Sequence, residues 1–293
     1  MTARRQLTPE DLQHRDGEAA FLDQLRNDVQ HNRLVLPSLP DVARKVREAV
    51  EDPHARVEHV ARVIGTDAAM SARLLKVANS PLYRRAGSPI DDVRTAVTRL
   101  GLSLVRTLII NLSIVQVLRP HRGGMGESLH RIFQHSVTVA TWSYALAERY
   151  TNISPHEAML AGMVHDIGYL PILQYAAHGK LAAHDPERLR SLLHRHHAEV
   201  GTVVLDTWNF GDGLKDVVRQ HENVYRTGRG PASLVDLVIA AELHAGHEDE
   251  PARRHIDRSR IPALLKLGLD ETAVGEDPQV RRLVAHAARL LRL

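Results

Sequence analysis

The segment from Leu102 to Leu118 would be apolar on nearly every face if it formed a helix. A helix of this kind is buried on all sides, so the segment is predicted to lie at the centre of the fold. Elsewhere apolar residues recur every three to four positions, which predicts amphipathic helices, as in Val57, Val60, Ala61 and Ile64. No segment alternates apolar and polar residues as a half-buried strand does. The sequence therefore predicts an all-α fold class.

The composition excludes several kinds of function. Aromatic residues make up only 4% of the chain, so the core must consist of aliphatic side chains, which favours helices packed on helices. Cysteine is absent, which excludes disulfides, zinc–thiolate sites and cysteine nucleophiles. The 38 basic residues are interleaved with 35 acidic ones. This mixture is typical of a solvated surface, and nucleic-acid binding is not expected.

Three parts of the chain are expected. They are a helical extension at 1–33, a main domain at 34–245 with helical halves 34–118 and 127–245, and a linker with a helical tail at 246–293. No secretory signal opens the chain, and polar residues interrupt its most apolar segment, so a cytoplasmic protein without a membrane span is expected.

The extension carries one apolar face, formed by Phe21, Leu22, Leu25 and Val29. This face either covers the core of its own chain or docks on a partner or a second protomer. A homodimer therefore stays open as an alternative.

The sequence around Ser154 predicts the start of a helix, with Ser154 as N-cap, Pro155 at the first helical position and Glu157 closing a capping box. Gly168 predicts its end. A helix over about 155–167 would carry the dipeptide His165-Asp166 in its last turn.

The last turn of a helix attracts cations, because its carbonyl groups lack partners. Adjacent helical residues point about 100° apart, so His165 and Asp166 need a second helix, carrying His135, to complete a metal site. The simpler interpretation of the dipeptide is a buried aspartate that holds a histidine by a hydrogen bond. The chain has 19 histidines, so the dipeptide alone favours that simpler interpretation.

Residues 151–173, with the motif His165–Gly168, resemble the core of the HD superfamily of metal-dependent phosphohydrolases. Three stretches upstream resemble, in this order, the motifs of the HDOD family, the HD-related output domain: Leu36–Ala43, Ile64–Ser80, and Ile90 to Leu100-Gly101. The resemblance covers about 34–245 and implies a two-lobed all-α domain, with an N-terminal helical half packed on an HD-like half. It also implies a bacterial signal-transduction module that acts through protein partners. The alternative is a metal-dependent phosphohydrolase of the HD superfamily, acting on a nucleotide or cyclic dinucleotide.

The resemblance to the HD superfamily implies a metal set of His135, His165, Asp166 and a later carboxylate. Glu242 stands where the superfamily has aspartate, and its side chain is one methylene longer. A divalent Mn, Fe, Zn or Ni ion would suit such ligands. The regulatory interpretation itself requires no cofactor.

His197 and His221 lie where the related HD-GYP phosphodiesterases carry further histidines, and they are weaker candidates because a hydrogen-bonded core histidine is equally expected. Tyr169 replaces the lysine that follows the His-Asp-Ile-Gly motif there, and Gln220 replaces the first of two paired histidines. Residues 228–231 match the Gly-Tyr-Pro signature only distantly. These departures favour the regulatory function, and no catalytic residue is predicted.

Parts of the family-like motifs have structural explanations. Asp67 is expected to cap the helix that it opens, and Gly101 to end a helix with a positive φ. Asn79-Ser80-Pro81 is expected to terminate a helix through bonds from side chain to backbone.

Overall fold

The computed structural model describes residue 27 and residues 36–52, 54–84, 89–119, 126–178, 186–245, 256–269, 275 and 277–291. In these described ranges the regular structure is entirely helical, which confirms the predicted fold class. The helices are α2 (Asp41–Glu51), α3 (Val57–Gly65), α4 (Ala68–Ala78), α5 (Val93–Leu100), α6 (Leu102–Leu118), α7 (Gly126–Tyr150), α8 (Pro155–Val164), α9 (Tyr169–His178), α11 (Pro186–Thr207), α12 (Asp212–Gln220), α13 (Leu234–Ala245), η2 (Arg258–Arg260), α14 (Pro262–Leu267) and α15 (Pro278–Leu291). The predicted extension at 1–33 and its apolar face lie outside the described residues, residue 27 excepted.

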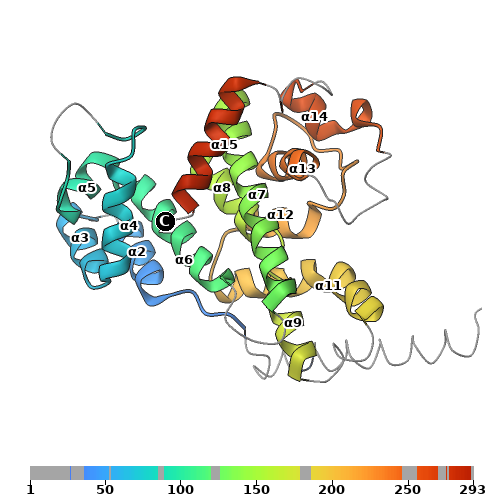
Figure 1. Ribbon diagram of the computed structural model, residues 1–293, viewed down its shortest axis with the longest axis horizontal. Helices are drawn as coiled ribbons and strands as arrows, with labels where there is room; N and C mark the ends of the chain where they lie inside the picture. Colours follow the sequence, from blue (N-terminus) through green and yellow to red (C-terminus); the bar gives the residue numbers. More distant parts are fainter. Residues whose placement is uncertain are drawn as a thin grey trace, which may run out of the picture.

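Helix α6 lies between two groups of helices (Figure 1). The first group is α2 to α5, and the second contains α7 to α15. Leu108 and Ile109 on α6 fill the core of the first group, whereas Ile110 and Ile114 belong to a core of the second. A helix with a core on either side must be apolar all round, so the prediction of a central buried helix is confirmed.

The motifs of the first group build its architecture. The Asp67 carboxylate accepts a hydrogen bond from the Met70 amide at 2.9 Å and caps α4, as expected. Gly101 has a φ of 83° between α5 and α6, also as expected. Asn79 ends α4, and its side chain donates to the Ile90 carbonyl at 2.7 Å and accepts from the Ile90 amide at 2.8 Å. Asn79 thus ties the end of α4 to the segment before α5.

The path of the chain changes direction between α5 and α6, which are bent by 113° relative to each other. Among the described helices, none is by itself long and apolar enough to cross a membrane. Only α5 and α6 taken together reach that length and composition.

The C-terminal helix α15 contacts both groups. Val280 belongs to the core around α7 and α13, and Ala287 and Leu291 belong to the core around α6 and α8. Leu290 reaches the core of the first group. Helix α15 therefore packs where the two groups meet (Figure 1).

Helix α8 begins at Pro155, as predicted, but it differs from the prediction in its capping and in its end. Ser154 is the N-cap, but its side chain makes no capping hydrogen bond. The helix ends at Val164, three residues earlier than predicted, and residues 165–168 form a turn before α9. Gly168 does not have a positive φ. A Cβ atom on it would lie 1.9 Å from the His197 carbonyl oxygen, so glycine is needed here for close approach to α11.

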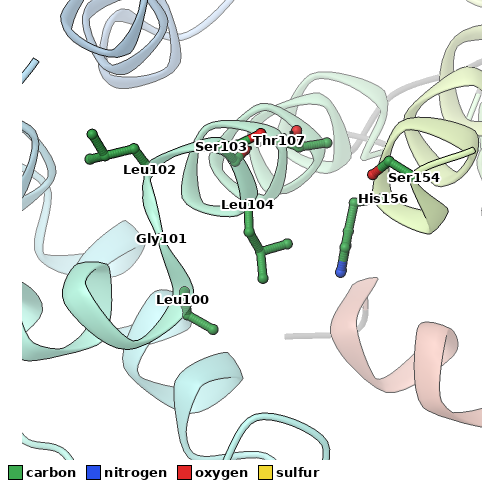
Figure 2. Close-up of a pocket in the computed structure, with 8 residues that line it drawn as sticks. All are labelled: Leu100, Gly101, Leu102, Ser103, Leu104, Thr107, Ser154 and His156. Carbon is green, nitrogen blue, oxygen red and sulfur yellow. Dashed lines mark hydrogen bonds between the residues drawn. The ribbon is translucent and has the colours of Figure 1, made fainter.

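His156 joins the two groups of helices. Its Nε2 atom lies 2.5 Å from the Tyr83 hydroxyl, and its carbonyl accepts a hydrogen bond from the Asn111 side chain on α6. Tyr144 on α7 packs edge-on against the His156 ring. His156 lines a cavity of about 340 Å³. Figure 2 shows its ring opposite the start of α6. His156 is only 6% exposed, so the charge state of its ring affects the stability of the fold.

Acidification is expected to destabilise the fold through His156. Burial, followed by the charge of His286, lowers the pKa of His156 to about 4, against 6.5 in an unfolded chain. The neutral ring therefore contributes its full stability above pH 6.5, and this contribution is lost as the pH falls towards 4, by about 1.4 kcal/mol per unit. Between pH 7.5 and 5 the wild type should lose roughly 2 kcal/mol more than His156→Gln, measured by denaturant unfolding. The exposed His59→Gln variant should follow the wild type, and equal losses in all three proteins would contradict the prediction.

Candidate metal centre

Six side chains that can bind a metal converge inside the second group of helices. They come from α7, the turn after α8, α11, the end of α12 and α13, and are His135, His165, Asp166, His197, His221 and Glu242. Their ligand atoms form three overlapping groups, and within each group all atoms lie within 4.8 Å of one another. The structure thus brings together the four principal candidates and both weaker ones.

One side of the cluster surrounds Oδ2 of Asp166. This oxygen lies 3.2 Å from Nε2 of His165 and 3.8 Å from Nε2 of His135. Oε1 of Glu242 lies 3.4 Å from the same His165 atom and 3.9 Å from the same His135 atom. Ligand atoms held about 2.1 Å from one ion are about 3.0 to 3.4 Å apart, so these spacings are close to those of a filled site. The extra methylene of Glu242 does not keep its carboxylate away.

The other side of the cluster surrounds Oδ1 of Asp166. Nε2 of His221 lies 3.3 Å from this oxygen, and Nε2 of His197 lies 3.7 Å from it. Glu222 adds a further carboxylate, with Oε1 at 3.6 Å from Nε2 of His197. Asp166 therefore offers one oxygen to each of two histidine pairs, an arrangement that has room for one or two cations.

Backbone carbonyls orient three of the four histidines. Nδ1 of His165 donates to the Gly162 carbonyl at 2.8 Å, and Nδ1 of His197 donates to the Leu193 carbonyl at 2.9 Å. Nδ1 of His221 lies 3.1 Å from the carbonyls of both residues 217 and 218. Because a carbonyl only accepts hydrogen bonds, each Nδ1 carries the hydrogen, and each Nε2 is left to face the cluster.

This donor set fits a metal ion. Nε2 of His197 and Nε2 of His221 are 3.4 Å apart, and the same atoms of His135 and His165 are 3.2 Å apart. In the neutral rings of His197 and His221 two lone pairs would face each other. A proton or a cation between them removes this repulsion, and imidazole nitrogen with carboxylate oxygen is a ligand set for borderline divalent ions.

The charges in the cluster shift the pKa of two of its members. Burial alone would raise the pKa of Asp166, but His165 and His221 outweigh burial and hold that pKa well below its usual value. Burial would lower the pKa of His221, but the hydrogen bond to Asp166 and the charge of Glu242 raise it to about 9. Asp166 is thus ionised at neutral pH, and a cation that binds Nε2 of His221 must displace a proton.

A buried ion-pair network fixes the two helices that carry His221 and Glu242. Asp236 on α13 is fully buried and accepts hydrogen bonds at 3.1 Å from both Arg226 and Lys266. Arg226 also donates to the Gln220 side chain at 2.7 Å. Through Arg226, the Gln220 side chain on α12 is linked to Asp236 on α13. This link gives a structural reason for an amide at the position where the HD-GYP enzymes have histidine.

Two features of the cluster were not predicted. Glu222 follows His221 directly, and this adjacency to a candidate ligand was the available signal. The Tyr169 ring stacks on the His197 ring, with centroids 4.6 Å apart and planes 27° apart. Tyr169 therefore covers one of the histidines at the position where the related enzymes carry lysine.

Comparisons with known proteins agree with this fold. A family model described as the HDOD domain matches residues 36–224. A candidate metal-dependent phosphohydrolase of known structure from Shewanella amazonensis SB2B is 28% identical, with a TM-score of 0.80, and the match covers 94% of this chain and 99% of that one. An HDOD domain protein with unknown function from Geobacter sulfurreducens is 24% identical, with a TM-score of 0.62 and coverage of 88% and 94%.

One curated relative is considerably longer than the matched region. An uncharacterized protein from Treponema pallidum (strain Nichols) is 21% identical over 224 residues, which cover 71% of this chain. The match covers 42% of that protein, so the chain spans less than half the length of this relative.

Proposed function

The chain belongs to the HDOD family, and on this basis we propose that it is a regulatory module that signals through protein–protein contacts. We also propose that its His/Asp centre holds a divalent metal with a structural role. In this proposal the metal fixes α7, α8, α11, α12 and α13 relative to one another. The surfaces of these helices are then presented to a protein partner in one defined arrangement.

The burial of the centre is the observation that carries this proposal. The most exposed of the six side chains is His135, at 18%, and Asp166 follows at 12%. His165, His197, His221 and Glu242 are each at most 2% exposed. Structural metal sites are enclosed by protein ligands, whereas catalytic sites keep a position open for water or substrate. A centre enclosed to this degree favours the structural role.

Tyr169 supports the same proposal. Phosphoryl transfer needs positive charge directed at the phosphoryl oxygens in the transition state. Tyr169 presents a neutral ring where the related phosphodiesterases have a lysine, and it stacks on His197. A phosphate ester that reached the centre past Tyr169 would therefore meet an uncharged phenol ring at the position where the related enzymes have a cation.

The residues that would hold the ion follow from the two sides of Asp166. His135, His165, Asp166 and Glu242 form one set, and His197 and His221 extend it on the other side. Nitrogen and oxygen donors in this proportion favour Mn, Fe, Zn or Ni. A divalent ion bound there would supply positive charge that offsets the two buried carboxylates and replaces the proton on His221.

The alternative function is a metal-dependent phosphohydrolase acting on a nucleotide or cyclic dinucleotide. It is favoured by the position of Asp166 between two histidine pairs, because hydrolases with two metal ions use bridging carboxylates of this kind. The 28% identical protein from Shewanella is also named as a phosphohydrolase. A bound metal would supply Lewis acidity and a nucleophilic hydroxide in such an enzyme.

Hydrolysis assays separate the two functions. We expect turnover of cyclic di-GMP, cyclic di-AMP and nucleoside triphosphates to stay at background with Mn, Fe or Mg supplied, because the centre is enclosed and Tyr169 brings no charge. Release of phosphate or linear nucleotide, measured over hours by chromatography, checks this. Metal-dependent turnover that disappears in Asp166→Asn but persists in the exposed-site variant Asp91→Asn would overturn the regulatory proposal and establish the enzyme.

A further inference from the structure

A second site lies between the two groups of helices, away from the metal centre. It is a cavity of about 320 Å³, within the size range of small-molecule sites. Arg47 on α2 and Arg106 on α6 are among the residues that line it. Glu157 on α8 and Phe210, between α11 and α12, also line it. None of the six metal-centre candidates lines this cavity.

Arg106 is the main indication of a ligand. Its Nε atom is buried, and the residue has no hydrogen bond or ion pair with any other described residue. A buried donor on a charged group without a partner is costly, and such groups are normally satisfied. An anion in the cavity would satisfy Arg106.

Arg47 adds a second cation that the fold already holds in place. Its side chain is 11% exposed, its Nη1 atom donates to the Trp208 carbonyl, and its guanidinium lies 5.6 Å from the centre of the Phe210 ring. Its Nε atom reaches Glu51 only at 3.8 Å. The head of Arg47 is thus oriented at low entropic cost, which suits it to bind an anion with Arg106.

The remaining walls define the rest of the ligand. Phe210, Ile110, Leu160 and Leu214 are apolar, so they would contact an apolar or planar body. Two carboxylates, those of Glu51 and Glu157, also line the cavity, but both residues are exposed to solvent. Arg47 and Arg106 are less exposed, so an anion inside the cavity would bind to these two arginines. Helix α12 begins at the cavity, and its N-cap, Gly211, has no side chain to cap the first N–H groups. The first turn of α12 therefore presents backbone N–H groups and a partial positive charge to the cavity.

We propose that this cavity binds a small organic anion, with its phosphate or carboxylate group on Arg106 and Arg47 and its apolar or planar body against Phe210. The inference goes beyond the regulatory function proposed above and does not depend on the metal centre. A ligand at this position contacts α2 and α6 on one side and α8 and the start of α12 on the other. It would therefore stabilise one arrangement of the two groups of helices, which is what an input signal to a regulatory module must do.

The test uses isothermal titration calorimetry on the full chain with three probes: adenosine 5′-monophosphate, phenylacetate and inorganic phosphate. Adenosine serves as the uncharged control. We expect the organic phosphate or the organic carboxylate to bind with a Kd below ~1 mM, and more tightly than inorganic phosphate or adenosine. Which of the two organic anions binds more tightly identifies the anionic group. Failure of both to bind below ~10 mM would overturn the proposal.

Matched variants locate the site. Arg106→Gln should weaken binding at least about tenfold, because one charge-assisted hydrogen-bond donor is lost. Arg62→Gln, at an exposed position on α3, should bind like the wild type. Circular dichroism checks that both variants fold.

A chelated sample distinguishes this site from the metal centre. Binding at the cavity should persist after treatment with EDTA, even if the proposed function fails. Binding that EDTA abolishes and that Arg106→Gln leaves unchanged would place the anion at the metal centre and refute the proposal.

Discussion

Replacing Gly168 by alanine is expected to be the most damaging single methyl addition in the described part of the chain. The new Cβ would lie 1.9 Å from the His197 carbonyl oxygen and 2.6 Å from the Gly201 amide nitrogen. Both atoms belong to the backbone of α11, so no flexible side chain can move aside. The turn at 165–168 and α11 would have to separate, and we expect a loss of more than about 3 kcal/mol of stability or failure to fold.

Gly65→Ala is the matched control. A Cβ atom on Gly65, the last residue of α3, meets nothing within 4 Å, and alanine is the better helix former, so stability should be unchanged or rise by up to about 1 kcal/mol. Thermal and denaturant unfolding of both variants provide the measurement. Since Gly168 holds the His-Asp turn against the helix that carries His197, Gly168→Ala should also lose metal if it folds. A Gly168→Ala protein within about 1 kcal/mol of wild type would show that α11 is not held at this distance.

The parts of the fold that could be predicted from sequence depend on local patterns. The burial of α6 follows from its apolar faces, and the caps at Asp67 and Gly101 follow from the conformations that these residues favour. Gly168 shows where such reasoning fails. A glycine after an apolar helix predicts a left-handed stop, but its actual role is contact with α11, about thirty residues away in sequence. No local pattern reports a contact of that kind.

The candidate site divides in the same way. His135, His165, Asp166 and Glu242 could be identified through the family resemblance, and the structure places them together. From the sequence, His197 is a weaker candidate because a hydrogen-bonded core histidine is equally expected there. Its position at the centre depends on how α11 crosses the His-Asp turn, which is a property of the packed helices. The residue pattern around His165 and Asp166 indicates only one further helix, the one with His135, whereas α11, α12 and α13 also bring candidate ligands to the centre, as the family resemblance implies.

Asp166→Asn is expected to remove both the metal and its contribution to stability. Asp166 lies within 4 Å of a nitrogen of all four histidines, so the loss of its charge affects both sides of the centre at nearly constant volume. Elemental analysis of protein purified without a histidine tag should find substoichiometric to stoichiometric metal in the wild type and a trace in the variant. A metal present at 100 to 1,000 times its Kd stabilises the folded state by about 3 to 4 kcal/mol. Its removal should lower the Tm by roughly 5–10 °C.

The response to a chelator separates loss of metal from loss of the carboxylate itself. EDTA should lower the Tm of the wild type and of Asp91→Asn, a matched change at an exposed site, and should leave the Tm of Asp166→Asn unchanged. If Asp166 instead acted only as a hydrogen-bond partner of buried histidines, Asp166→Asn would be destabilised while the wild type would contain no metal and ignore EDTA. That result would leave a fold whose centre is held by the proton on His221, because the raised pKa of His221, about 9, keeps its ring charged against Asp166 and Glu242 at neutral pH.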